Sequence, residues 1–110
     1  MRPQRTDKEM PKERQKIEME LMAQNIAFDK SSMIVPRSAE VTIQFHNKDD
    51  GIPHNFALYK DSSTSKSFFR GEIFPGIADR TYRFNAPDEP GNYYFQCDVH
   101  PQMNGDFIVE

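Results

Sequence analysis

"EVTIQFHN", residues 40–47, carries the pattern that decides the fold of this chain. Val41, Ile43 and Phe45 alternate with polar residues, and a period of two places all three apolar side chains on one face of an extended strand. β-Branched and aromatic residues also favour strand over helix. We therefore predict a half-buried β-strand over residues 40–47.

Segments of the same kind occur on both sides of this strand. Upstream, apolar and polar residues alternate from residue 17 to residue 23, and "SMIVP" follows at 32–36. The downstream segments are "NFALY" (55–59), "FFRGEIF" (68–74), "DRTYRFNAP" (79–87), "NYYFQC" (92–97) and "GDFIVE" (105–110). Pro, Gly, Asp and Asn residues separate them. About eight short strands at this spacing predict an all-β fold, an antiparallel Greek-key sandwich or barrel.

A change in composition divides the chain near residue 16. The first sixteen residues hold two prolines and many charges without apolar periodicity. We interpret residues 1–16 as a charged linker or tether and residues 17–110 as one domain, with a short helix over 12–22 as the alternative. No apolar run is long enough for a membrane span or a signal peptide. The sequence therefore predicts a soluble piece, either a mature secreted form or a domain cut from a longer protein.

The distribution of charge bears on the partners. The leader is basic, whereas the remainder of the chain is acidic within a total net charge of −3. Nucleic-acid binding requires clustered Lys and Arg side chains. An acidic domain therefore argues against nucleic acid as the partner.

"FQCDVHPQMNG", residues 95–105, contains the only cysteine of the chain, at the spacing Cys97-x2-His100-x2-Met103. These residues lie on the loop between the last two predicted strands. A thiolate, an imidazole and a thioether together suit copper better than zinc, iron or magnesium. A structural zinc site would need four strong Cys or His ligands. The ordinary alternative is a buried, inert thiol, since one cysteine excludes an internal disulfide.

A trigonal Cys-His-His copper site with a weak axial Met needs a second histidine. His54, in "GIPHNFALY", lies where a loop enters a predicted strand, and in a sandwich this loop and the 97–103 loop can meet at the same end. We interpret His46, at the end of its own strand, as an ordinary surface histidine. Each of the four residues alone has an ordinary explanation as a turn, core or inert side chain, but the four together indicate a metal site.

These motifs resemble those of the cupredoxins, small type 1 (blue) copper proteins that carry single electrons. The resemblance depends on "PHN" at 53–55 and "YYFQCDVHPQMNGDFIV" at 93–109, and it extends over residues 17–110. The short Cys-x2-His-x2-Met loop with proline after the histidine is similar to that of the amicyanins, whereas plastocyanins and pseudoazurins place the methionine two residues further on. The turn "PRSAE" at 36–40 lacks a glycine that the family often has there.

The resemblance implies a ligand set for one type 1 copper ion. His54, Cys97 and His100 would be the strong ligands and Met103 the weak axial ligand. Asn55 would tie the two ligand loops together and donate toward the thiolate, which is second-shell control of the metal. A red-copper site of the nitrosocyanin type would lack its histidine, because the corresponding loop position is Gly105. A purple binuclear site would need two cysteines.

The resemblance also implies an electron carrier that cycles between Cu(I) and Cu(II) and is not an enzyme. Redox-partner proteins would dock briefly near His100 and Pro101, over an apolar patch that we expect to include Pro53, Ile52 and Phe74. We expect a monomer in the periplasm or outside the cell, reaching a membrane only through a tether in residues 1–16.

Three alternatives remain at this point. The chain could be an electron-transfer domain of a larger copper oxidase or reductase, with the same site and a partner domain in the same chain. It could be a copper carrier that uses Met10, Met19 and Met22. It could also be a binding module that has kept the fold without the metal.

Overall fold

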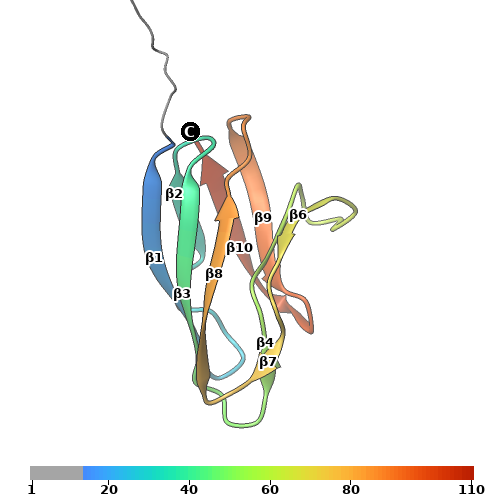
Figure 1. Cartoon of the computed structure of the whole chain (residues 1–110). Coiled ribbons are helices and arrows are strands. Elements are labelled where there is room, and N and C mark those ends of the chain that lie inside the picture. The colour runs from blue at the N-terminus through green and yellow to red at the C-terminus, as the bar shows by residue number, and fades with distance from the viewer. Residues whose placement is uncertain (1–13) are drawn as a thin grey trace, which may run out of the picture.

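The predicted strand over residues 40–47 is β3 (Glu40–Asn47), the central strand of a three-stranded sheet. In the computed structural model, which describes residues 14–110, β3 lies between β1 (Lys16–Ala23) and β8 (Ala78–Asn85). β1 pairs with β3 in parallel, in register Lys16↔Glu40, and β8 pairs with it antiparallel. Figure 1 shows this sheet in blue, green and orange.

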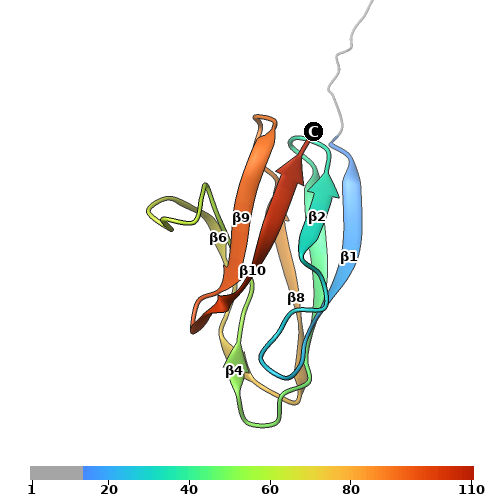
Figure 2. The same cartoon turned by 180° about the vertical axis from the view of Figure 1, so that it is seen from behind.

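A second, five-stranded sheet faces the first. Its strand order is β2 (Ser32–Val35), β10 (His100–Val109), β9 (Gly91–Cys97), β5 (Ala57–Tyr59) and β6 (Ser67–Arg70). Figure 2 shows β2, β10 and β9 side by side from behind. Two strands of two residues each, β4 (Pro53–His54) and β7 (Phe74–Pro75), form a separate ribbon at one end of the sandwich.

Apolar side chains from both sheets fill the space between them. Val41, Ile43 and Phe45 are each at most 1% exposed, as their alternation predicts. Phe56, from the segment before β5, lies 5.4 Å from Phe95 of the same sheet and 5.7 Å from Phe84 of the opposite sheet, centroid to centroid. Aromatic contacts of this kind bury large areas and dominate the energetics of a core. The sandwich is therefore closed by one continuous core.

The all-β sandwich predicted from the sequence is confirmed. Residues 14–110 form ten strands, and the helix considered over 12–22 is wrong for residues 16–22, which belong to β1. Within the described part of the chain we find no helix of the length and apolar character that a membrane-spanning segment requires. Residues 1–13, most of the predicted linker, lie outside the described residues.

The expected antiparallel arrangement is only partly right, because two strand pairs are parallel. These pairs are β1–β3 and β2–β10. The chain leaves the first sheet after β1, forms β2 in the other sheet and then returns to form β3 beside β1. A strand that returns to its sheet through the opposite layer can run parallel to its neighbour, whereas a tight hairpin cannot.

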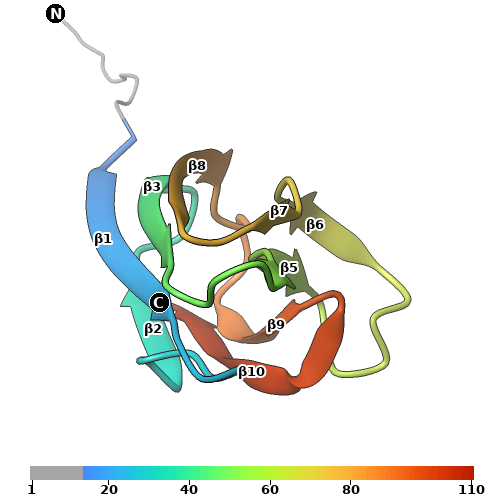
Figure 3. The same cartoon turned by 90° about the horizontal axis from the view of Figure 1, so that it is seen from below.

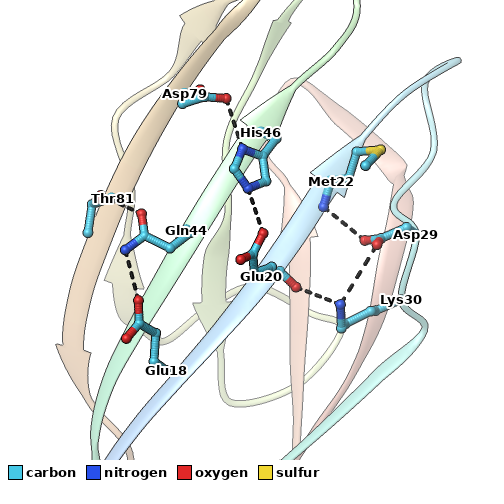
Figure 4. A network of polar contacts seen from close by, with 9 residues as sticks. All are labelled: Glu18, Glu20, Met22, Asp29, Lys30, Gln44, His46, Asp79 and Thr81. Carbon is cyan, nitrogen blue, oxygen red and sulfur yellow. Dashed lines mark hydrogen bonds and ion pairs between the residues drawn. The ribbon is translucent and has the colours of Figure 1, made fainter.

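His46 joins three strands on the outer face of the first sheet (Figure 4). Its Nδ1 lies 2.9 Å from Oδ1 of Asp79 on β8, and its Nε2 lies 2.9 Å from Oε1 of Glu20 on β1. A carboxylate only accepts hydrogen bonds, so both contacts are satisfied together when the imidazole carries two protons. These hydrogen bonds, that of Asp79 first, raise the pKa of His46 above 6.5. This histidine is a surface residue that clamps β1, β3 and β8.

The His46 clamp predicts a pH dependence of stability. Because the pKa of His46 is raised in the folded state, the folded protein binds this proton more tightly than the unfolded chain. The clamp therefore contributes fully to the free energy of unfolding below the unfolded pKa of 6.5. This contribution is lost as the pH rises through the folded pKa. The side chains of Asp79 and Glu20 are 70% and 72% exposed, so we expect the clamp to contribute less than about 1 kcal/mol to the free energy of unfolding. Urea unfolding of the metal-free protein between about pH 6 and 9 should show this loss in the wild type and a smaller loss in His46→Gln. Equal losses in the two proteins would exclude the clamp as their cause.

Candidate metal centre

The turn that presents His54 is organised by the buried side chain of Asn47. Its Nδ2 donates to the carbonyl oxygens of Ile52 at 2.9 Å and Phe74 at 3.0 Å, and its Oδ1 accepts from the amide of Asp49 at 2.9 Å. One amide thereby fixes the turn after β3 and attaches it to β7. His54 follows at the end of β4, paired with Phe74.

Cys97 and His100 lie at the tip of the hairpin between β9 and β10. Cys97 ends β9, His100 begins β10, and the two residues pair directly across the turn. The register then shifts between His100 and Asn104, so residues 101–103 of β10 have no partner on β9. Such an irregularity redirects side chains locally. Met103 lies within this unpaired segment and is only 2% exposed.

The structure brings His54, Cys97 and His100 together, although His54 and Cys97 are 43 residues apart. Nδ1 of His54 lies 3.5 Å from the Cys97 sulfur, and Nδ1 of His100 lies 3.7 Å from it. The three potential ligand atoms all lie within 4.8 Å of one another. Bonds of about 2.0 Å to nitrogen and 2.3 Å to sulfur, as zinc makes, put the ligand atoms of one ion about 3.5–4 Å apart. The two sulfur–nitrogen distances therefore suit a single metal ion.

Most of the cluster is shielded from solvent. His54 and Cys97 are 0% exposed, while His100 is half-buried and reaches the surface. Cys97 and Met103 belong to the same hydrophobic core cluster. Met103 is thus buried on the strand that begins with His100, and its assignment as the axial ligand stays a prediction.

The environment of Cys97 holds its thiol in the protonated form while no cation is bound. Burial raises the pKa of Cys97, and the charge of Asp98 raises it further. The backbone amides of Asn55, Val99 and His100 lower the pKa of Cys97, but it is raised overall. A metal ion would replace this proton, because only the thiolate is a ligand.

Asn55 joins the two segments that carry the cluster. It is fully buried, and its Oδ1 accepts from the amide of Asp98 at 2.8 Å. Its Nδ2 donates to the carbonyl oxygen of Gly71 at 2.9 Å and to Oδ2 of Asp98 at 3.1 Å. The residue after His54 is therefore bonded to the residue after Cys97.

Asp98 was not identified from the sequence. Its carboxylate accepts hydrogen bonds from the Tyr59 hydroxyl at 2.6 Å, from Nε2 of Gln96 at 3.1 Å and from Nε of Arg70 at 3.4 Å. Burial favours a higher pKa for Asp98, but these donors outweigh it and the pKa is lowered. Burial and the Asp98 charge raise the pKa of Tyr59 to about 12. A fixed negative charge thus stands directly after the cysteine.

Asp49 was also missed, because an aspartate in "NKDDG" is typical of any turn. Its Oδ2 lies 2.8 Å from Nε2 of His54, on the side of the ring away from Cys97. The same carboxylate accepts from the amides of Asn25 at 2.7 Å and Ile26 at 2.9 Å. Burial opposes ionisation of Asp49, but the hydrogen bonds from His54 and the two amides lower its pKa overall.

The surface next to His100 is apolar in part. Val99 is 42% exposed, and Pro101 and Pro53 are exposed beside the two histidines of the cluster. The inclusion of Phe74 in this patch is wrong, since Phe74 is 2% exposed and its ring packs 5.8 Å from that of Phe45 in the core. Figure 3 views the molecule from this end.

Three solved structures with the same fold are distantly related to this chain in sequence. Auracyanin A of Chloroflexus aurantiacus, described as a blue copper protein, is 22% identical over 86% of this chain and 99% of its own, with a TM-score of 0.75. Rusticyanin of Thiobacillus ferrooxidans is 17% identical over 87% of this chain and 78% of its own, with a TM-score of 0.72. Amicyanin of Paracoccus versutus is 22% identical over 94% of this chain and 87% of its own, with a TM-score of 0.57.

Comparison with curated protein sequences gives no significant match. The family model described as "Cupredoxin-like domain" matches residues 4–109. That span covers nearly the whole chain, including every strand and all members of the metal cluster. The chain therefore belongs to the cupredoxin-like domain family.

Proposed function

We propose that this protein is a type 1 copper electron-transfer protein that cycles between Cu(I) and Cu(II). His54, Cys97 and His100 would hold one copper ion, with Met103 as the weak axial ligand. The observation that carries the proposal is the convergence of one thiol and two imidazole nitrogens within 4.8 Å at the end of the core. The blue copper proteins that share the fold support it.

The donor set favours copper over other metals. A thiolate and a thioether are soft ligands and imidazole is intermediate, which is the combination that copper selects. Within residues 14–110, no carboxylate or third imidazole belongs to the group of ligand atoms. A structural zinc site would be expected to use a fourth Cys or His, and a magnesium or calcium site would use oxygen ligands.

The chain's own contribution to electron transfer is rigidity and exclusion of water. Copper, when bound, supplies the one-electron chemistry. Asn47 fixes the turn before His54, and Asn55 bonds the His54 segment to the Cys97 segment. Ligands held in this way cannot rearrange to suit one oxidation state, so little reorganisation accompanies transfer. The half-buried His100 offers the shortest route from the buried cluster to the surface.

These features support a carrier rather than an enzyme. Four protein ligands leave no open position at which a substrate would bind. A redox partner would dock briefly over His100, Val99, Pro101 and Pro53, where small and weakly held contacts permit turnover. We propose a monomer of periplasmic or extracellular location, with residues 1–16 as linker or tether to residues 17–110.

An electron-transfer domain of a larger copper oxidase or reductase would use the same site. The length of the full gene product distinguishes such a domain from a separate carrier protein.

The copper-carrier alternative has less support. Met19 packs against the core and Met22 lies on the same strand, β1. Their place in this strand explains both methionines without copper binding. Met10 lies outside the described residues.

Addition of Cu(II) to the metal-free protein tests the proposal. We expect a strong blue absorption band with narrow copper hyperfine splitting in the electron spin resonance spectrum, bleached by ascorbate. Cys97→Ala should lose the band completely, because the thiolate is the source of the charge-transfer absorption. His46→Gln is the matched control, since this histidine lies outside the cluster and its variant should stay blue. A pale spectrum with ordinary splitting in the wild type would contradict a type 1 site.

Met103→Leu tests the axial ligand. Leucine conserves the buried volume, so the fold and the blue band should survive. Loss of the weak thioether donor removes electron density that favours Cu(II), and the reduction potential should rise. Cyclic voltammetry of wild type and variant measures this shift. An unchanged potential would show that Met103 is only a core residue.

A further inference from the structure

We propose that Asp49 is a positioning residue for the metal centre. It fixes the tautomer and orientation of His54, and its buried negative charge lowers the reduction potential. The redox part of this inference rests on the proposed function, whereas the tautomer part concerns the protein without metal.

The first step is the contact itself. Oδ2 of Asp49 lies 2.8 Å from Nε2 of His54, while Nδ1 of the same ring lies 3.5 Å from the Cys97 sulfur. The His54 side chain is fully buried and that of Asp49 is 9% exposed. Water therefore competes little for either end of the ring, and the two contacts determine where its protons are.

The second step follows from the chemistry of the partners. An ionised carboxylate can only accept a hydrogen bond, so the proton must be on Nε2 of His54. A ring that carries this one proton presents a bare Nδ1 toward Cys97, and in the metal-free protein the thiol can donate to it. The ligand nitrogen is thus available for a metal ion before any ion arrives.

The third step is that Asp49 cannot easily turn away. Its carboxylate also accepts from the amides of Asn25 and Ile26, and its own amide donates to Oδ1 of Asn47 at 2.9 Å. Both loop residues have positive φ values, 58° and 54°, which aim successive amides at one acceptor. The carboxylate is therefore held from three sides, and it holds the plane of the His54 ring in turn.

The fourth step concerns charge. In residues 14–110 no Lys or Arg side chain pairs with the Asp49 carboxylate, whose partner is the His54 ring. The Asp98 carboxylate beside Cys97, by contrast, pairs with Arg70. A buried, uncompensated negative charge makes the imidazole a stronger electron donor and favours the more highly charged Cu(II) over Cu(I). The expected consequence is a lower reduction potential than the copper ligands alone would give.

Two measurements test this inference. The first uses nitrogen-15 NMR of the histidine rings in the metal-free wild-type protein. We expect the proton of His54 on Nε2, protected from exchange with water, and a bare Nδ1. Asp49→Asn should weaken this protection, because the amide side chain is a poorer acceptor.

The second measurement is the reduction potential of the copper-loaded protein. Asp49→Asn should change the equilibrium constant for reduction on the order of tenfold in favour of Cu(I). For a one-electron couple, this raises the reduction potential by about 59 mV. Asp29→Asn is the matched control, because it removes the same charge from the β1–β2 loop, which also carries the Asn25 and Ile26 amides that bind Asp49. Oδ1 of Asp29 accepts from the amide of Met22 at 2.8 Å, and its side chain is 42% exposed. Its variant should shift the potential much less.

A proton on Nδ1 of His54 in the metal-free wild type would overturn the inference, and so would equal shifts in the two variants. If Asp49→Asn does not fold, the wild-type NMR result still decides the tautomer. If the wild type binds copper without a blue band, the proposed function fails, and the metal-free measurement still tests the role of Asp49.

Discussion

The hydrogen bond from the Asp98 amide to the Asn55 side chain is the contact on which the metal centre depends. It joins the residue after His54 to the residue after Cys97 across 43 positions of the sequence, at 2.8 Å and with the Asn55 side chain fully buried. A buried amide left without partners costs about 1–3 kcal/mol, so the segments are stabilised only when they lie together. The convergence of a thiol and two imidazoles follows from this pairing and from the Asn47 contacts that position the turn before His54.

Local patterns explain which parts of the structure could be predicted from the sequence. The alternation of Val41, Ile43 and Phe45 fixes which face of β3 is buried, because strand periodicity is a property of neighbouring residues. The Cys97-x2-His100 spacing belongs to one hairpin tip, so these two residues meet without information from elsewhere. His54 could be predicted only by assuming a sandwich in which its loop meets the 97–103 loop at the same end.

The features that could not be predicted are those that depend on distant segments. The parallel pairs β1–β3 and β2–β10 arise because the chain crosses between sheets, and no local pattern records a crossing. Phe74 belongs to "FFRGEIF", but β6 ends at Arg70 and β7 begins at Phe74, so the alternation does not continue between them. The sequence therefore did not indicate whether the Phe74 side chain points into the core or to the surface. Asp49 resembled an ordinary turn residue until the fold placed His54 against it.

Asp49 and Asp98 also explain why the site favours a bound cation over an empty, ionised thiol. Both carboxylates are held by several hydrogen bonds, and their pKa values are lowered. A thiolate at Cys97 would add a third negative charge, and burial together with Asp98 accordingly raises the thiol pKa. In the metal-free protein the thiol proton avoids this third charge. A metal cation would take the place of that proton, so binding would be coupled to the stability of the folded state. The two carboxylates would thus favour a bound cation over an empty, ionised thiol.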